Sequence, residues 1–152
     1  MLSIVIPVFN ERESLPHLWK EINHVLADDS NWEILFIDDG SSDGSLDYLA
    51  DLCKNNSAVK LVQFYRNFGK SAALSEGFKH AQGDTIVTMD GDLQDDPAEI
   101  PNLINKLEED MTWFPAGKRL GMIRGLKLFL PKYSIFSPDY LPVLKFMTST
   151  AG

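Results

Sequence analysis

The chain has 152 residues, of which 44% are hydrophobic, and these values suit one domain with a modest core. Its net charge of −8 argues against nucleic acid as a partner, because an acidic protein does not attract polyphosphate by counter-ion release. The single Cys53 excludes a disulfide framework. Residues 1–10 lack the basic start of a secretion signal, and no run of about 18 apolar residues occurs, so we expect a soluble, cytoplasmic chain.

The chain begins with a pattern of strands that alternate with helices. Residues 2–9 (LSIVIPVF) and 32–38 (WEILFID) are short, apolar and rich in β-branched side chains, as strands buried on both faces are. Between them, apolar residues at helical spacing predict a helix that ends at the turn-forming residues 28–31. A second helix, capped by Ser42 or Asp43, follows the second strand.

The alternation continues through two more strands. Residues 59–65 predict a third strand, residues 71–81 a third helix and residues 84–90 a fourth strand. Pro97 suits the first position of a fourth helix. We therefore predict an α/β fold, a Rossmann-like parallel sheet with alternating helices, in one domain that spans residues 1–112.

Residues 113–152 differ from the rest of the chain in charge and in pattern. They carry 6 Lys and Arg against 1 Asp, whereas residues 1–112 carry 8 Lys and Arg against 21 Asp and Glu. Prolines interrupt every apolar run, so we expect an irregular tail with little secondary structure. Its apolar residues and the open sheet edge predict self-association. Its charge and aromatic residues also suit a membrane surface, although the prolines disfavour a long amphipathic helix.

A polar motif follows each of the four predicted strands. The carboxyl ends of parallel strands lie at one edge of a sheet, and open α/β sheets bind their ligands at that edge. We therefore expect one site assembled from all four motifs. The motifs are IPVFNE (6–11), DDGSSDG (38–44), RNFGKSAALSEG (66–77) and MDGDLQDDP (89–97).

The last motif is the strongest indication of a metal site. Gly91 separates Asp90 from Asp92, and because glycine allows a tight turn and the close approach of a ligand, both carboxylates can face one hard cation. Mg²⁺ and Mn²⁺ favour oxygen ligands together with substrate phosphates, which predicts a bound nucleotide diphosphate. We interpret Asp95 and Asp96 as solvated residues of the turn that caps the following helix.

Carboxylates also close the second predicted strand. Adjacent buried carboxylates are costly unless a ligand or a donor satisfies them, so we assign Asp39 to binding of a base or ribose and regard Asp38 as structural. Asn10 and Glu11, after the first strand, fit nucleotide binding and an ordinary polar turn equally well.

Other classes of nucleotide enzyme are disfavoured. Gly69-Lys70-Ser71 resembles the end of a phosphate-binding loop, but Phe64 stands where that loop needs a glycine, and no dinucleotide-binding glycine motif follows the first strand. Arg66 and Lys70 are therefore either contacts to a diphosphate or ordinary surface charges. A nucleotidyltransferase stays an alternative, because it too pairs carboxylates around a metal, although VFNERES is not the glycine-rich basic loop that it should carry.

Together the four motifs resemble the amino-terminal half of family 2 glycosyltransferases, most closely the branch of dolichyl-phosphate mannose synthases and undecaprenyl-phosphate sugar transferases. The resemblance covers about residues 2–112 and implies the amino-terminal part of a GT-A fold. It implies inverting transfer of a sugar from a UDP- or GDP-linked donor to a polyprenyl phosphate, with Mg²⁺ or Mn²⁺ as cofactor. It also implies that the full-length protein acts at the cytoplasmic face of the membrane in cell-envelope glycan synthesis.

The resemblance also implies roles for individual residues. Asp90 would lie beside the sugar and diphosphate, and Asp92 and Gln94 would ligate the metal. Asp90 and Asp92 are thus the implied catalytic pair. The residues implied to hold the nucleotide are Pro7, Asn10, Glu11, Asp39, Lys70 and Asp90.

The resemblance ends at about residue 112. Family members continue with a strand, a basic acceptor loop and amphipathic or membrane-spanning helices, and none of these is recognisable in residues 113–152. We hypothesise that this segment is translated in a shifted reading frame, because regrouping its back-translated codons permits family-like strings. We therefore expect impaired transfer by this truncated chain, and a catalytically inactive nucleotide-sugar-binding fragment stays an alternative.

Overall fold

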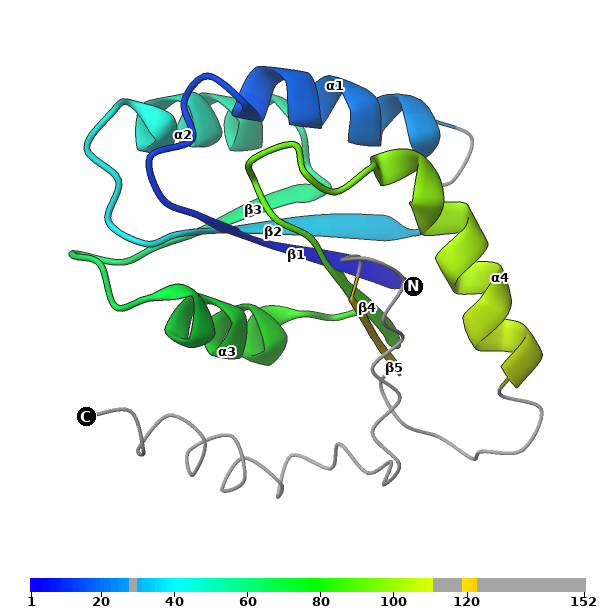
Figure 1. Ribbon diagram of the computed structural model, residues 1–152. Helices are drawn as coiled ribbons and strands as arrows, with labels where there is room; N and C mark the ends of the chain where they lie inside the picture. Colours follow the sequence, from blue (N-terminus) through cyan, green and yellow to red (C-terminus); the bar gives the residue numbers. More distant parts are fainter. Residues whose placement is uncertain (28–29, 111–118, 123–152) are drawn as a thin grey trace.

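The computed structural model describes residues 1–27, 30–110 and 119–122. Within them, five strands form one sheet in the order β3-β2-β1-β4-β5, and every neighbouring pair is parallel (Figure 1). The predicted Rossmann-like parallel sheet is therefore confirmed. The strands are β1 (Leu2–Val8), β2 (Trp32–Asp38), β3 (Val59–Gln63), β4 (Thr85–Thr88) and β5 (Arg119–Met122).

Helices cover both faces of the sheet (Figure 1). Alternate residues of a strand face opposite sides, so Ile4 and Ile6 of β1 pack in one buried cluster and Val5 packs in the other. The first cluster also contains buried side chains of α1, α2 and α4, and the second contains those of α3. The helices are α1 (Leu15–Val25), α2 (Ser45–Asn55), α3 (Lys70–His80) and α4 (Ile100–Asp110), the last preceded by the 3-10 turn η1 (Pro97–Glu99).

The strand order reverses beside β1. The chain runs outward from β1 through β2 to β3. It then returns as α3, on the face of the sheet opposite to α1 and α2, and forms β4 on the other side of β1. Gly77 makes this return compact, because a Cβ atom there would lie 2.3 Å from Cγ1 of Val5. The carboxyl ends of β1 and β4 therefore form a topological switch point, the usual position of a ligand site in open α/β sheets.

Two helix starts differ in detail from the sequence prediction. The residue before α2 is Gly44, and Asp43 supports the helix from one position earlier, since its Oδ1 accepts a hydrogen bond from the Ser45 amide at 2.9 Å. Pro97 is the first residue of a turn, as expected, but this turn is the 3-10 segment η1. Both differences are shifts at helix ends, where local backbone geometry decides the boundary.

The sequence predicted an irregular tail with little secondary structure over residues 113–152, and the structure differs at β5. This strand pairs in parallel with β4 along four residues. Main-chain groups of an open sheet edge can pair with any extended segment, so side-chain periodicity gave no sign of it. The other predictions for the tail fall on residues 111–118 and 123–152, outside the described residues. In the part of the chain that the structure describes, no helix has the length and hydrophobicity needed to cross a membrane.

Candidate functional site

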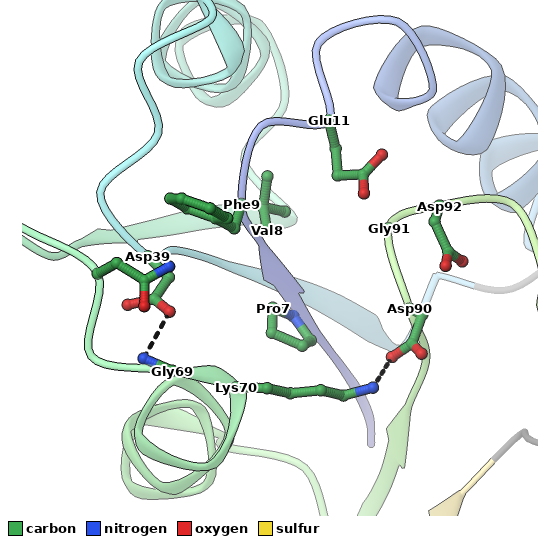
Figure 2. A pocket seen from close by; sticks show the side chains of 11 residues that line it. Pro7, Val8, Phe9, Glu11, Asp39, Gly69, Lys70, Asp90, Gly91 and Asp92 are labelled. Carbon is green, nitrogen blue, oxygen red and sulfur yellow. Dashed lines mark hydrogen bonds and ion pairs between the residues drawn. The ribbon is translucent and has the colours of Figure 1, made fainter.

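A cavity of about 280 Å³ lies at the carboxyl ends of the strands, at the switch point beside β1 (Figure 2). All four sequence motifs contribute to its walls, so the structure brings their residues together. Asn10 and Gln94 belong to the same motifs but do not line the cavity. The lining residues are Pro7, Val8, Phe9, Glu11, Asp39, Asn67, Gly69, Lys70, Asp90, Gly91 and Asp92.

Asp39 is a buried carboxylate that the chain itself satisfies. Its Oδ1 accepts a hydrogen bond from the Phe68 amide at 2.6 Å. Its Oδ2 accepts one from the Gly69 amide at 2.8 Å, which Figure 2 shows. The donors that a carboxylate in this position requires therefore come from the loop before α3, which the two bonds hold against β2. A carboxylate has about four acceptor positions, so these bonds leave capacity for a ligand.

Asp38 shapes the neighbouring loop. The residue is fully buried, and its Oδ2 accepts a hydrogen bond from the Ser41 amide at 3.3 Å. Its Oδ1 has no hydrogen-bond partner among the described residues. Asp38 does not line the cavity, in keeping with the structural role expected for it.

The segment after β1 is tied to the segment after β2. Asn10 has a left-handed backbone (φ +56°), its amide donates to Oγ of Ser41 at 3.0 Å, and its Oδ1 accepts from the Ser42 amide at 2.9 Å. The Glu11 amide donates to Oγ of Ser45 at 2.9 Å. The side chain of Asn10 thus holds the loop, whereas Glu11 lines the cavity.

A lysine and an aspartate face each other across the cavity. Nζ of Lys70, at the start of α3, pairs with Oδ1 of Asp90, which follows β4 (Figure 2). Arg66, the other candidate for a diphosphate contact, does not line the cavity, and its guanidinium lies 4.7 Å from the centre of the Phe68 ring. Lys70 is therefore the cation that the fold places beside the acidic motif.

The turn after β4 differs from the sequence prediction at its glycine. The left-handed residue of this turn is Leu93 (φ +63°), and Gly91 has no positive φ. A Cβ atom at Gly91 would lie 3.6 Å from Cγ of Glu11, an ordinary contact. The tight turn thus depends on Leu93, while Asp92 is exposed and its Oδ1 accepts from the Gln94 amide at 3.1 Å.

Asp95 is not the solvated turn residue that we expected. It is only 7% exposed, and its Oδ2 accepts a hydrogen bond from the Asp90 amide at 2.8 Å. Burial, assisted by the nearby charges of Asp90 and Asp92, raises the pKa of the Asp95 carboxyl. The sequence could not show this contact because it depends on the left-handed turn between the two residues. Asp96 is exposed and caps η1 as predicted, since its Oδ1 accepts from the Ala98 amide at 2.9 Å.

The donor chemistry of the cavity fits a divalent metal shared with a phosphate. Asp90 and Asp92 offer hard carboxylate oxygens at one end of the cavity, and the Lys70 ammonium already places a positive charge beside Asp90. The described residues contain no group of three or more His, Cys, Asp and Glu side chains that could hold a metal by themselves. Mg²⁺ and related ions need no such group where substrate phosphates complete the coordination.

Comparison with known sequences identifies relatives. The sequence model of the family described as "Glycosyl transferase family 2" matches residues 3–141. The undecaprenyl-phosphate 4-deoxy-4-formamido-L-arabinose transferases of Salmonella choleraesuis (strain SC-B67) and Salmonella newport (strain SL254) are each 44% identical over 110 residues. These matches cover 71% of this chain and 34% of each relative, so the chain spans about a third of the length of these curated relatives.

Solved structures share the fold. A mannosyltransferase from Pyrobaculum calidifontis, in complex with GDP-Man and Mn²⁺, has a TM-score of 0.56 at 24% identity, over 60% of this chain and 27% of its own. S. aureus TarS, in complex with UDP-GlcNAc, has a TM-score of 0.57 at 19% identity, over 71% of this chain and 31% of its own. At these identities the likeness shows the fold, which is the amino-terminal part of the GT-A arrangement.

Proposed function

Because this chain belongs to glycosyl transferase family 2, we propose that its cavity binds a nucleotide-diphosphate sugar together with Mg²⁺ or Mn²⁺. The observation that carries the proposal is the meeting of Asp39, Lys70 and the Asp90–Asp92 pair around one cavity at the switch point of the sheet. The Salmonella relatives are undecaprenyl-phosphate sugar transferases by name, and two solved neighbours hold GDP-Man with Mn²⁺ and UDP-GlcNAc.

The nucleotide would extend from Asp39 toward Lys70. The remaining acceptor capacity of Asp39 suits an N–H of the base or a hydroxyl of the ribose, with Pro7 and Glu11 lining the same cavity. Asn10 would act by holding the loop that presents these two residues. Gly69 and Lys70 bring the amino end of α3 to the cavity, and there the helix dipole and the ammonium both favour a diphosphate.

Asp90 and Asp92 would hold the metal, with Gln94 on the same turn as a further ligand. When bound, the metal neutralises negative charge that develops on the departing diphosphate, a contribution of several kcal/mol. Lys70 would keep the charge of Asp90 compensated and contact the phosphates from the other side of the cavity. Asp90, between Lys70 and the turn, would lie beside the transferred sugar.

For the whole protein we propose inverting transfer of the sugar to a polyprenyl phosphate at the cytoplasmic face of the membrane. An acceptor phosphate oxygen is already an anion, so the reaction requires no general base. Positioning of donor and acceptor and electrostatic compensation would then carry the catalysis. For the present chain, which spans about a third of its relatives' length, we propose donor binding with weak or absent transfer.

Calorimetry tests donor binding directly. We expect UDP or GDP to release heat on titration into the full 152-residue chain, and Mn²⁺ to strengthen binding of that nucleotide at least about tenfold, that is by about 1.4 kcal/mol. No heat for either nucleotide, with and without Mn²⁺, would overturn the proposal. A transfer assay with radiolabelled donor and a polyprenyl phosphate then separates an active enzyme from a fragment that only binds nucleotide sugar.

A further inference from the structure

Resting on the proposed function, we infer that Asp95 is a positioning residue, which fixes the backbone of Asp90 so that the Asp90 carboxylate faces the metal and the diphosphate. Asp95 lies outside the cavity lining and acts through its hydrogen bond to the Asp90 amide, at 2.8 Å. The proposed role of Asp95 therefore involves no contact with the ligand.

The burial of Asp95 has a cost that the fold alone does not explain. Asp92 and Asp96, on the same turn, are exposed, whereas Asp95 is 7% exposed. A buried carboxylate close to other carboxylates is unfavourable, because neither desolvation nor like charge favours its ionised form. The buried position allows the hydrogen bond to Asp90, the first aspartate of the motif MDGDLQDDP (89–97).

The bond closes the turn between Asp90 and Asp95. Between the two partners, Leu93 has a left-handed backbone, a conformation that costs a leucine about 1–2 kcal/mol. Within the turn, Asp92 accepts from the Gln94 amide, but that contact spans only two residues. The contact of Asp95 spans five residues and reaches the point where β4 ends and the Asp90 side chain turns toward Lys70.

Asp96 offers a matched control on the same turn. It is also an aspartate whose carboxylate accepts a backbone amide, from Ala98 at 2.9 Å, but this amide belongs to η1 and not to a site residue. Removal of either carboxylate deletes one hydrogen bond of similar length. A merely structural role of Asp95 therefore predicts similar effects of the two substitutions on ligand binding.

The test measures Mn²⁺ affinity by electron paramagnetic resonance in the presence of UDP or GDP, with thermal unfolding to confirm that each variant is folded. We expect Asp95→Ala to weaken Mn²⁺ binding about 10- to 100-fold, as loss of a residue that orients a metal ligand does. Asp95→Asn keeps a side-chain oxygen that can accept from the Asp90 amide and should stay within about threefold of the original chain. Asp96→Ala should also stay within about threefold, because the bond it loses is a helix cap.

Amide hydrogen exchange gives a second readout that needs no ligand. Loss of the hydrogen bond in Asp95→Ala should speed exchange at the Asp90 amide about tenfold, whereas Asp95→Asn should preserve its protection. Unchanged exchange in Asp95→Ala would overturn the inference, and so would equal loss of Mn²⁺ affinity in Asp95→Ala and Asp96→Ala. If the original chain bound no Mn²⁺ with either nucleotide, the proposed function would fail, and the exchange rates would still decide whether Asp95 fixes the backbone of Asp90.

Discussion

The acidic side chains at the two ends of the sheet have different surroundings. At the amino end, Glu33 of β2 is 3% exposed and accepts hydrogen bonds from Oγ of Ser3 at 2.5 Å, the Gln82 amide at 2.6 Å and Nζ of Lys60 at 2.6 Å. At the carboxyl end, carboxylates gather around a cavity, and the Asp92 side chain is exposed. Glu33 is enclosed by donors of the protein, whereas Asp95 at the carboxyl end is buried close to the charges of Asp90 and Asp92.

The pKa shifts at the two ends have opposite directions. Burial acts to raise the pKa of Glu33, but hydrogen bonds from Lys60, Ser3 and the Gln82 amide together hold it below its ordinary value. Burial raises the pKa of Asp95, the charges of Asp90 and Asp92 act in the same direction, and the hydrogen bond from the Asp90 amide opposes the rise only in part. Ionisation of Glu33 therefore stabilises the fold, whereas the carboxyl-end acids favour a cation brought by a ligand. A substitution at the amino end should therefore lower the stability of the fold, whereas a substitution at the carboxyl end should weaken ligand binding.

The largest effect should come from Asp92→Asn. Asp92 is exposed, and its hydrogen bond from the Gln94 amide lies within its own turn, so the free energy of unfolding should change by no more than about 0.5 kcal/mol. Loss of the carboxylate should weaken Mn²⁺ binding in the presence of nucleotide at least about 100-fold, that is by about 2.7 kcal/mol. Calorimetry measures the affinities for Mn²⁺ and for the nucleotide. The control is Asp84→Asn, an exposed acid at the amino end that pairs with the amino terminus; a similar loss in this variant would remove the distinction between the ends.

Glu33→Ala should produce the converse result. Breaking a fully buried ion pair costs about 3–5 kcal/mol, but the Lys60 side chain is 38% exposed and can turn to water, so we expect a loss of about 2 kcal/mol in the free energy of unfolding. Nucleotide affinity should not change, because Glu33 lies roughly 20 Å from Asp39 along β2. Urea denaturation and calorimetry measure the two quantities. Unchanged stability, or a fall in affinity comparable with that in Asp92→Asn, would contradict the comparison.

A smaller effect concerns the pH dependence of stability. Because the pKa of Glu33 is lower in the folded chain than its ordinary value of 4.5, its contribution is complete above that value and is lost as the pH falls below it. Glu33→Gln should therefore be less stable than the original chain at about pH 7, and the difference should shrink as the pH falls below 4.5. Asp43 and Glu76 also have lowered pKa values, so the variant should still lose some stability in acid. If the urea midpoints of the original chain and of Glu33→Gln fell in parallel as the pH is lowered, the proposed contribution of Glu33 would be wrong.

Much of the fold could be predicted from the sequence, because the strands are buried on both faces and their apolar runs are continuous. The convergence of the four motifs followed from the rule that parallel strands end at one edge. The role of Asp39 was only partly predictable. Its need for donors was evident from burial, but the donors are the Phe68 and Gly69 amides, and their approach depends on a loop conformation that no periodicity encodes.

The surroundings of two acidic residues, Asp95 and Glu33, could not be predicted from the sequence, for different reasons. The acidic neighbours of Asp95 predict a solvated turn residue, but the turn that buries Asp95 contains the left-handed backbone of Leu93. Glu33 did give a signal, since an acid inside the apolar run 32–38 must find donors or destabilise the strand. Its donors come from β1, β3 and the segment before β4, which only the strand order brings together.

A crystal structure with Mn²⁺ and UDP or GDP, in which anomalous scattering locates the metal, would test whether Asp90 and Asp92 bind it. We expect an anomalous peak within about 2.5 Å of carboxylate oxygens of both Asp90 and Asp92, in contact with the diphosphate. A Mn²⁺ peak elsewhere in the molecule, with these two carboxylates directed away from each other, would contradict this expectation.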